Sequence, residues 1–307
     1  MLVPFKDLLA DALAGGYAVG YFEAWDVYSL EAVLEVAEAE SAPVILGFGG
    51  VMMEQGWLDG GGLERLGALG LATAKAARVP VYFILNEVLT FDQVVRGMQA
   101  GFNAVMLDTS ELPYEENVRL TWQVVQVAHA LGVGVEAEVG ALPDASGDMG
   151  GGTGRKTDPE EAARFVQETG VDALAVSVGN VHTLTDGRAV IDLERLAAIH
   201  QAVGVPLVIH GGTGFPDEAV AAAIALGVAK FNLGAVLKQA FLTGLREATL
   251  ALPPEVSFHQ AIGSRKETDV LQQGKLRMKA EVARRLRLYR PDRPGRLNIC
   301  DTLTRQS

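Results

Sequence analysis

Side chains suited to metal or acid–base chemistry follow several apolar runs of this sequence. Glu87, Glu138, His182 and His210 all lie at or just after such runs. If the runs are neighbouring parallel strands, two imidazoles from adjacent strand ends can reach one divalent ion, because neighbouring strands lie about 5 Å apart. A carboxylate can complete the set and leave positions open for water or substrate. The sequence therefore predicts a metal bound by His182 and His210, with Glu87 or Glu138 supplying an oxygen.

The pairing of the two histidines carries more weight than either residue alone. A single histidine after an apolar strand is more simply interpreted as a buried structural residue. Two histidines at adjacent strand ends instead favour the interpretation that both bind one metal ion. The remaining histidines, His129, His200 and His259, fall in helix-like or terminal segments and are expected to have no such role.

The elements that must position these residues repeat about eight times as a strand followed by a helix. Most of the apolar runs are continuous, as expected for parallel strands buried on both faces. The predicted strands are Tyr17–Ala24, Pro43–Gly49, Val79–Asn86, Ala104–Thr109, Val133–Gly140, Ala173–Gly179, Pro206–Gly212 and Ala229–Gly234. The helical segments include Ser29–Glu40, Gly61–Ala77, Glu115–Leu131, Pro159–Thr169, Asp192–Ala202 and Asp217–Leu226.

Eight such units in 307 residues favour a closed (β/α)₈ TIM barrel over an open doubly wound sheet. We expect the barrel to occupy residues 1–252 and a C-terminal helical arm to occupy residues 253–307, with a long basic helix over 266–288. The basic face is interpreted as solvated or as a subunit contact, with binding of an anionic substrate as the alternative. The Gly-rich segment 144–156 is expected to form a mobile loop on the active-site face.

Composition narrows the class of protein. The formal net charge of −12 argues against nucleic-acid binding, and no apolar run is long enough to cross a membrane. The N-terminus lacks the pattern of a secretory signal, so a cytoplasmic location is expected. Cys300 is the only cysteine, which leaves histidines and carboxylates as the metal ligands.

Glycine-rich turns indicate a place for an anion at the same end of the barrel. Gly211, Gly212 and Thr213 follow His210, and Asn232 begins a similar turn. Glycines allow a ligand to approach the backbone, and helix N-termini offer N–H donors. Gly179, before His182, is included in this expected pocket for the substrate.

Six motifs together resemble the class II fructose- and tagatose-bisphosphate aldolases. They cover about residues 1–250 in the family's order, and they are GYAV at 16–19, APVI at 42–45, VMLDTS at 105–110, VEAEVG at 135–140, ALAV at 173–176 and VIHGGTG at 208–214. In that family three histidines hold a zinc ion, which polarises the carbonyl of dihydroxyacetone phosphate so that an enediolate forms and adds to an aldehyde. The resemblance implies a metal-dependent aldolase for a ketose phosphate or related keto substrate.

The same resemblance implies roles for individual residues. His182 and His210 match two of the zinc ligands, and Glu138 matches a carboxylate associated with an alternative metal position. Glu87 replaces the third histidine, so it becomes the expected third ligand. The metal implied is Zn²⁺, with Mn²⁺, Fe²⁺, Co²⁺ and Mg²⁺ as alternatives, and the family implies a homo-oligomer.

Other positions depart from the family. Asn86 replaces the catalytic aspartate and cannot carry a proton. Glu23 replaces an asparagine, so Glu23 or Glu138 is the candidate proton carrier. Gly49 replaces a serine-like residue, and Gly234 and Ala235 alter the phosphate motif, so a bisphosphate is a poor fit.

Two alternatives remain open from the sequence. A metal-dependent isomerase or epimerase of a sugar phosphate would use the same residues but end in return of the proton. A non-catalytic sugar-phosphate-binding relative would explain the lost aspartate and phosphate donors. Against this second alternative, the carboxylates of Glu23 and Glu87 are costly to bury without a cation.

Overall fold

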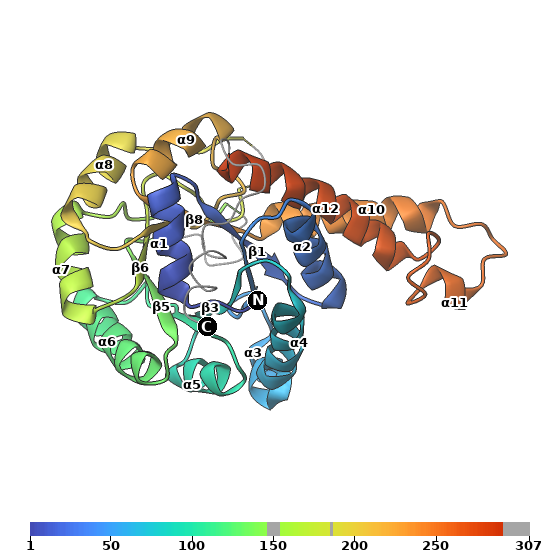
Figure 1. Ribbon diagram of the computed structural model, residues 1–307, viewed down its shortest axis with the longest axis horizontal. Coiled ribbons are helices and arrows are strands. Elements are labelled where there is room, and N and C mark those ends of the chain that lie inside the picture. The colour runs from blue at the N-terminus through green and yellow to red at the C-terminus, as the bar shows by residue number, and fades with distance from the viewer. Residues whose placement is uncertain (146–153, 185–186, 291–307) are drawn as a thin grey trace.

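The chain forms a closed barrel of eight parallel strands, which confirms the predicted TIM barrel (Figure 1). The computed structural model describes residues 1–145, 154–184 and 187–290. Each strand pairs with its neighbours in chain order, and β1 pairs with β8 to close the sheet. The strands are β1 Val19–Ala24, β2 Val44–Gly49, β3 Val81–Val88, β4 Ala104–Leu107, β5 Gly134–Val139, β6 Ala173–Val176, β7 Leu207–Ile209 and β8 Val228–Leu233.

Helices surround the sheet and protect its outer face. They are α1 Phe5–Gly15, α2 Val27–Ala39, α3 Gln55–Trp57, α4 Leu63–Ala76, α5 Phe91–Gln99, α6 Tyr114–Ala130, α7 Pro159–Thr169, α8 Leu193–Ala202, α9 Asp217–Ala225, α10 Ala235–Leu250, α11 Phe258–Ala261 and α12 Val270–Tyr289, with a π-helical turn η1 at Leu58–Gly62. Because the strands are buried on both faces, their apolar runs are continuous rather than alternating.

The hydrophobic core has two parts. One lies between the sheet and the outer helices, and the other fills the barrel interior. Helix α1 closes one end of the barrel, where Phe5 packs edge-on against Tyr82 with ring centroids 4.8 Å apart. The opposite end, at the carboxyl ends of the strands, is where function gathers in this fold.

Two strand boundaries differ from the expected ones in a way that affects the site. β3 continues to Val88 rather than ending at Asn86, and Glu87 has a positive φ of 51° inside it. β6 ends at Val176, so His182 lies in the following loop rather than directly at a strand end. Residues 146–153 of the expected mobile loop lie outside the described residues. Arg155, in the described part of that loop, forms an antiparallel β-bridge with Ala141, which precedes the loop.

An arm of helices α10, α11 and α12 projects from the barrel (Figure 1). The long basic helix begins at Val270, four residues later than the expected start at 266, with Asp269 capping it by accepting from the Leu271 N–H. Helix α10 follows β8 directly, and Gly244 on it lies so close to α12 that a β-carbon there would contact Gln273. The division of the chain at residue 252 stays a prediction. No helix within the described ranges is long and apolar enough to cross a membrane.

The basic charge of α12 is matched largely within the chain itself. Lys275 donates to Glu31 and Glu35 on α2, with Nζ–O distances of 2.8 and 2.5 Å. Arg285 is buried and donates to the carbonyl oxygens of Gly212 and Thr213. The helix therefore fastens the arm to the barrel and supports the loop that follows His210.

Candidate functional site

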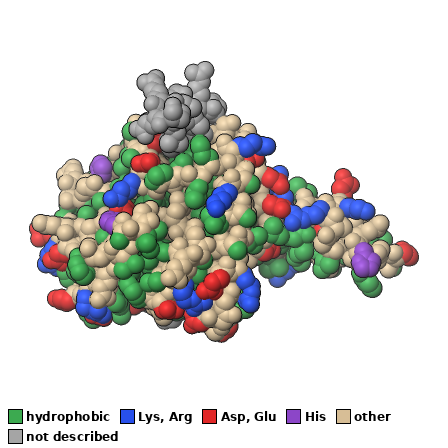
Figure 2. Space-filling view, turned by 60° about the horizontal axis from the view of Figure 1, so that its bottom comes forward, with side chains coloured by type: hydrophobic (Ala, Val, Ile, Leu, Met, Phe, Trp, Pro, Cys, Tyr) green, Lys and Arg blue, Asp and Glu red, His purple; other side chains and the backbone are tan. Residues whose placement is uncertain are grey.

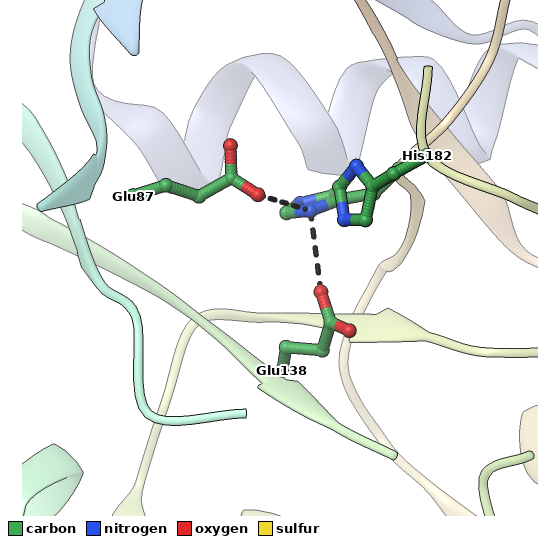
Figure 3. A group of neighbouring side chains, drawn as sticks. Glu87, Glu138 and His182 are labelled. Carbon is green, nitrogen blue, oxygen red and sulfur yellow. Dashed lines mark hydrogen bonds and ion pairs between the residues drawn. The ribbon is translucent and has the colours of Figure 1, made fainter. Parts of the chain in front are cut away.

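Four side chains that the sequence singles out meet at the carboxyl end of the barrel. They are Glu87 from β3, Glu138 from β5, His182 from the loop after β6 and His210 directly after β7. One potential ligand atom from each lies within 4.8 Å of the others. Figure 3 shows Glu87, Glu138 and His182 directed toward a common point from different sides. The two imidazole centroids are 6.0 Å apart, so both rings can reach one ion.

His210 lies at the centre of this cluster, and its two ring nitrogens have different partners. Nδ1 is 3.0 Å from Oε1 of Glu87 and 3.2 Å from Oε2 of Glu138. Nε2 is 2.9 Å from Oε1 of Glu136, which is fully buried. With Nε2–H donating to Glu136, Nδ1 is the nitrogen that faces the cluster and can bind a cation. A carboxylate behind a ligating histidine fixes the tautomer and the ring orientation.

A second buried group supports Glu136 from inside the barrel. Nζ of Lys230 lies 2.9 and 2.8 Å from the two carboxylate oxygens of Glu136. The same ammonium donates to Oδ1 of Asn232 at 2.6 Å. Glu136 and Lys230 are fully buried in the middle of strands β5 and β8. The sequence analysis did not identify either residue, although a lysine inside an otherwise apolar strand and a second glutamate two residues before Glu138 were the available signals.

A buried asparagine holds the two loops that carry the histidines. Asn180 donates to the carbonyl oxygen of His210 at 2.9 Å and to that of Val176 at 3.2 Å. Its own Oδ1 accepts from the Val178 N–H at 2.8 Å. The bonds to Val176 and His210 join the loop after β6 to two strand ends, and the bond from Val178 braces the loop itself, so Asn180 fixes the separation of His182 and His210.

The charged groups of the cluster shift one another's pKa values. Burial disfavours a charged His210, but the carboxylates of Glu87, Glu136 and Glu138 outweigh it and raise its pKa to about 10. Burial raises the pKa of Glu138 to about 8, against the opposing effect of His210 and with the help of Glu87. Burial also disfavours ionised Glu87, yet His210 and Lys230 bring its pKa to about 2.

The cluster fits a divalent cation on charge and on ligand type. Three buried or largely buried carboxylates, those of Glu87, Glu136 and Glu138, face the ammonium of Lys230 and two imidazoles. A bound cation would offset the negative charge that remains when the histidines are neutral. Mixed imidazole and carboxylate ligands suit Zn²⁺, Mn²⁺, Fe²⁺ or Co²⁺.

A cavity of about 570 Å³ opens over the cluster. Its lining includes eight of the expected site residues, namely Glu23, Asn86, Glu87, His182, His210, Gly211, Thr213 and Asn232. Among the described residues, Glu138, Gly179 and Gly212 do not line it. Gly179 is placed by packing, since a β-carbon there would lie 2.2 Å from the carbonyl oxygen of Val190.

Asn86 and Asn232 both line the cavity, and each amide is held by one hydrogen bond. Nδ2 of Asn86 donates to Oε2 of Glu87 at 2.6 Å, and Oδ1 of Asn232 accepts from Lys230. The other amide atom of each, Oδ1 of Asn86 and Nδ2 of Asn232, is buried and has no hydrogen-bond partner in the described part of the chain.

Glu23 is held at the cavity wall by a residue that the sequence analysis did not identify. Nζ of Lys238, in the first turn of α10, donates to Oε1 of Glu23 at 2.7 Å. Burial raises the pKa of Glu23, and the ammonium of Lys238 opposes that shift. Lys238 gave no signal in the sequence because it lies in a helical segment beyond the glycine-rich turn.

The other three histidines lie away from this cluster. Nε2 of His129 pairs with Asp172 at 3.0 Å on the outer helix layer. His200 and His259 are exposed. Their placement agrees with the expectation that they have no part in the site.

Comparisons with known proteins bear on the family and the fold of this chain. The family model described as fructose-bisphosphate aldolase class-II matches residues 3–292. A fructose-bisphosphate aldolase of Geobacillus stearothermophilus is 39% identical over 257 residues, which are 83% of this chain and 88% of that protein. The YdjI aldolase of Escherichia coli K12 superposes with a TM-score of 0.78 at 29% identity, covering 96% of this chain and all of that one. A fructose-bisphosphate aldolase of Campylobacter jejuni, at 24% identity and a TM-score of 0.72 over 94% and 95% of the two chains, shares the fold.

Proposed function

This chain belongs to the class II fructose-bisphosphate aldolase family and is a metal-dependent aldolase, and from that premise we propose that His182, His210 and Glu87 hold its metal. The observation that carries the proposal is the cluster of ligand atoms within 4.8 Å of one another at the mouth of the barrel. A divalent cation supplies Lewis-acid polarisation of a carbonyl group. Zn²⁺ is the proposed ion, with Mn²⁺, Fe²⁺, Co²⁺ or Mg²⁺ as alternatives.

The residues around the ligands have distinct proposed tasks. Glu136 accepts from Nε2–H of His210 and keeps Nδ1 directed at the ion, while Lys230 compensates the charge of Glu136. Glu138 stands beside the same nitrogen and serves as a reserve oxygen ligand or proton carrier. Glu136, Lys230 and Glu138 are all buried, so each is proposed to act on the groups that it contacts directly.

Glu23 and Glu138 are the two candidate proton carriers in place of the family's aspartate. Glu23 lines the cavity, whereas Glu138 does not among the described residues and lies beside Nδ1 of His210. In aldol cleavage one of these carboxylates would take the proton from the hydroxyl group whose carbon becomes the aldehyde as the carbon–carbon bond breaks. If Glu23 contacts the far end of the ketone half, that task belongs to Glu138. Asn86 cannot carry a proton itself, and its proposed task is to orient the carboxylate of Glu87 through Nδ2.

The substrate is proposed to be a small sugar-phosphate or keto compound bound against the glycine-rich turns. Gly211, Thr213 and Asn232 line the cavity and would contact the ketose half. Family membership favours this lyase reaction over the isomerase and the non-catalytic alternative. We further propose a cytoplasmic location.

The decisive test is metal content together with aldol cleavage. Purified wild-type protein is expected to contain about one divalent ion per chain and to cleave ketose phosphates in a chelator-sensitive reaction. His182→Ala is expected to lose the ion and the activity, whereas His259→Ala, an exposed histidine of the arm, is expected to retain both. A His182→Ala protein with wild-type metal content and turnover would overturn the proposal.

A homo-oligomer is proposed from the projecting arm. Leu250 and Phe258 are 89% and 88% exposed there, and Leu242, Ile262 and Leu276 are also exposed. Hydrophobic side chains are visible along this arm in Figure 2. Several exposed apolar side chains on one projecting arm are typical of protein–protein contacts. A second copy of the chain is the proposed partner.

A further inference from the structure

The carboxylate of Glu23 occupies space that two glycines leave open. A β-carbon at position 234 would lie 2.1 Å from Oε2 of Glu23, and one at position 49 would lie 3.1 Å from Oε1. A side chain at 234 would therefore force this carboxylate to move, and one at 49 would crowd it. Glu23, Gly49 and Gly234 are thus three positions whose residue types fit one another.

The same carboxylate lies where the wall of the cavity would otherwise attract an anion. Gly234 is the N-cap residue of α10, a helix of 16 residues, and it has no side chain to cap this end; the Val236 N–H donates to Oγ1 of Thr213 at 3.3 Å. The N-terminus of a helix carries partial positive charge and favours an anion. Oε2 of Glu23 is close enough to Gly234 to supply that anion from within the chain.

The remaining cation at this wall is also engaged. Lys238 is the lysine or arginine that lines the cavity in the described ranges, and its Nζ is 2.7 Å from Oε1 of Glu23. The pair is charge-neutral, and Asn232 lines the same cavity. A carboxylate oxygen that is paired with a lysine can still accept a hydrogen bond from a hydroxyl group.

We propose that the Glu23–Lys238 pair makes this subsite select a neutral, hydroxyl-bearing end of the ketone and disfavour a phosphate there. A phosphate dianion would have to displace Glu23 from Lys238, or bind beside its negatively charged carboxylate. A hydroxymethyl group can donate to Oε2 of Glu23 with the ion pair intact. Any phosphate on the substrate would then lie at its other end. The inference rests on the proposed function only in assigning this cavity to the substrate.

The test compares binding of two ketones and requires no turnover. Dissociation constants of dihydroxyacetone and dihydroxyacetone phosphate would be measured by calorimetry on the metal-loaded full chain, for wild type, Glu23→Gln and Lys238→Met. Glu23→Gln is expected to shift the ratio of the two constants at least about tenfold toward the phosphorylated ketone, because one unit charge beside a dianion is removed. Lys238→Met is expected to shift it in the opposite direction. Glu247→Gln, on the same helix and paired with Arg277, is the matched control and should leave the ratio unchanged.

Both shifts are required by the inference. Absence of either shift, with the two ketones still binding, would overturn it and leave the proposed aldolase site intact. If neither ketone bound to any variant, the inference would fall together with the proposed substrate class. Loss of metal on substitution of His182, by contrast, tests only the proposed function.

Discussion

Substitution of Lys230 by methionine would test how far the buried ion pair under the metal cluster determines stability. Lys230 contacts both oxygens of Glu136 at 2.8 and 2.9 Å and Oδ1 of Asn232 at 2.6 Å, and it is fully buried. Methionine has a similar length and no charge. The substitution therefore leaves the Glu136 carboxylate in the barrel interior with His210 as its remaining polar contact.

The expected loss of stability follows from the burial of the partner that is left. Breaking a buried ion pair by removing one member costs about 3–5 kcal/mol. His210, whose pKa is raised to about 10, still lies 2.9 Å from Glu136, so the lower end of that range, about 3 kcal/mol, is expected. That corresponds to a fall in Tm of roughly 6–12 °C. Replacing both members, as Lys230→Met with Glu136→Gln, is expected to recover about 2 kcal/mol, since the excess buried negative charge is then gone.

The assay is denaturant and thermal unfolding of the four proteins of this cycle, each with the metal removed by a chelator. Lys156→Met is the matched control, because Lys156 forms a 3.0 Å pair with Asp192 at the surface and its loss should change the free energy of unfolding by less than about 1 kcal/mol. If Lys230→Met were as stable as this control, or if the effects of the two buried substitutions simply added, the interpretation of Glu136 and Lys230 as a coupled pair would be refuted.

Two further substitutions test the cavity wall and the arm. Gly234→Ala places a β-carbon 2.1 Å from Oε2 of Glu23 and is expected to lower kcat/KM at least about tenfold through displacement of that carboxylate, while metal content stays at the wild-type level; unchanged kinetics would contradict the tight fit. Leu250→Glu combined with Phe258→Glu places charges on the exposed apolar surface of the arm and is expected to reduce the oligomer to smaller species in sedimentation velocity, whereas a wild-type protein that sediments as a monomer would exclude the proposed contact.

The barrel was predictable because its signal is repeated along the chain. Eight apolar runs separated by helical segments specify alternating buried strands and covering helices, whatever the details of each loop. Loop positions were less accessible. His182 lies six residues beyond β6, and Asn180 fixes its placement through contacts to Val176 and His210 that no local pattern reveals. The approach of His182 to His210 therefore depends on tertiary contacts rather than on sequence periodicity.

The charged residues of the interior were harder to predict than the ligands. Glu136 and Lys230 lie 94 positions apart, and their pairing depends on the closed sheet that brings β5 and β8 across the interior. The contact of Lys238 with Glu23 likewise depends on the packing of α10 beside β1, which the sequence does not reveal. Sequence periodicity predicts which strand ends point toward the mouth, but it does not predict which buried charges compensate one another.

Three departures from the family pattern, at Glu23, Gly49 and Gly234, lie next to one another in the structure. Glu23, Gly49 and Gly234 surround one carboxylate, and Lys238 neutralises it. Random loss of function would not be expected to leave glycine at the two points where the carboxylate of Glu23 needs room, with a lysine 2.7 Å from that carboxylate. The fit of these four residues is therefore the structural basis of the proposed preference for a neutral end of the ketone.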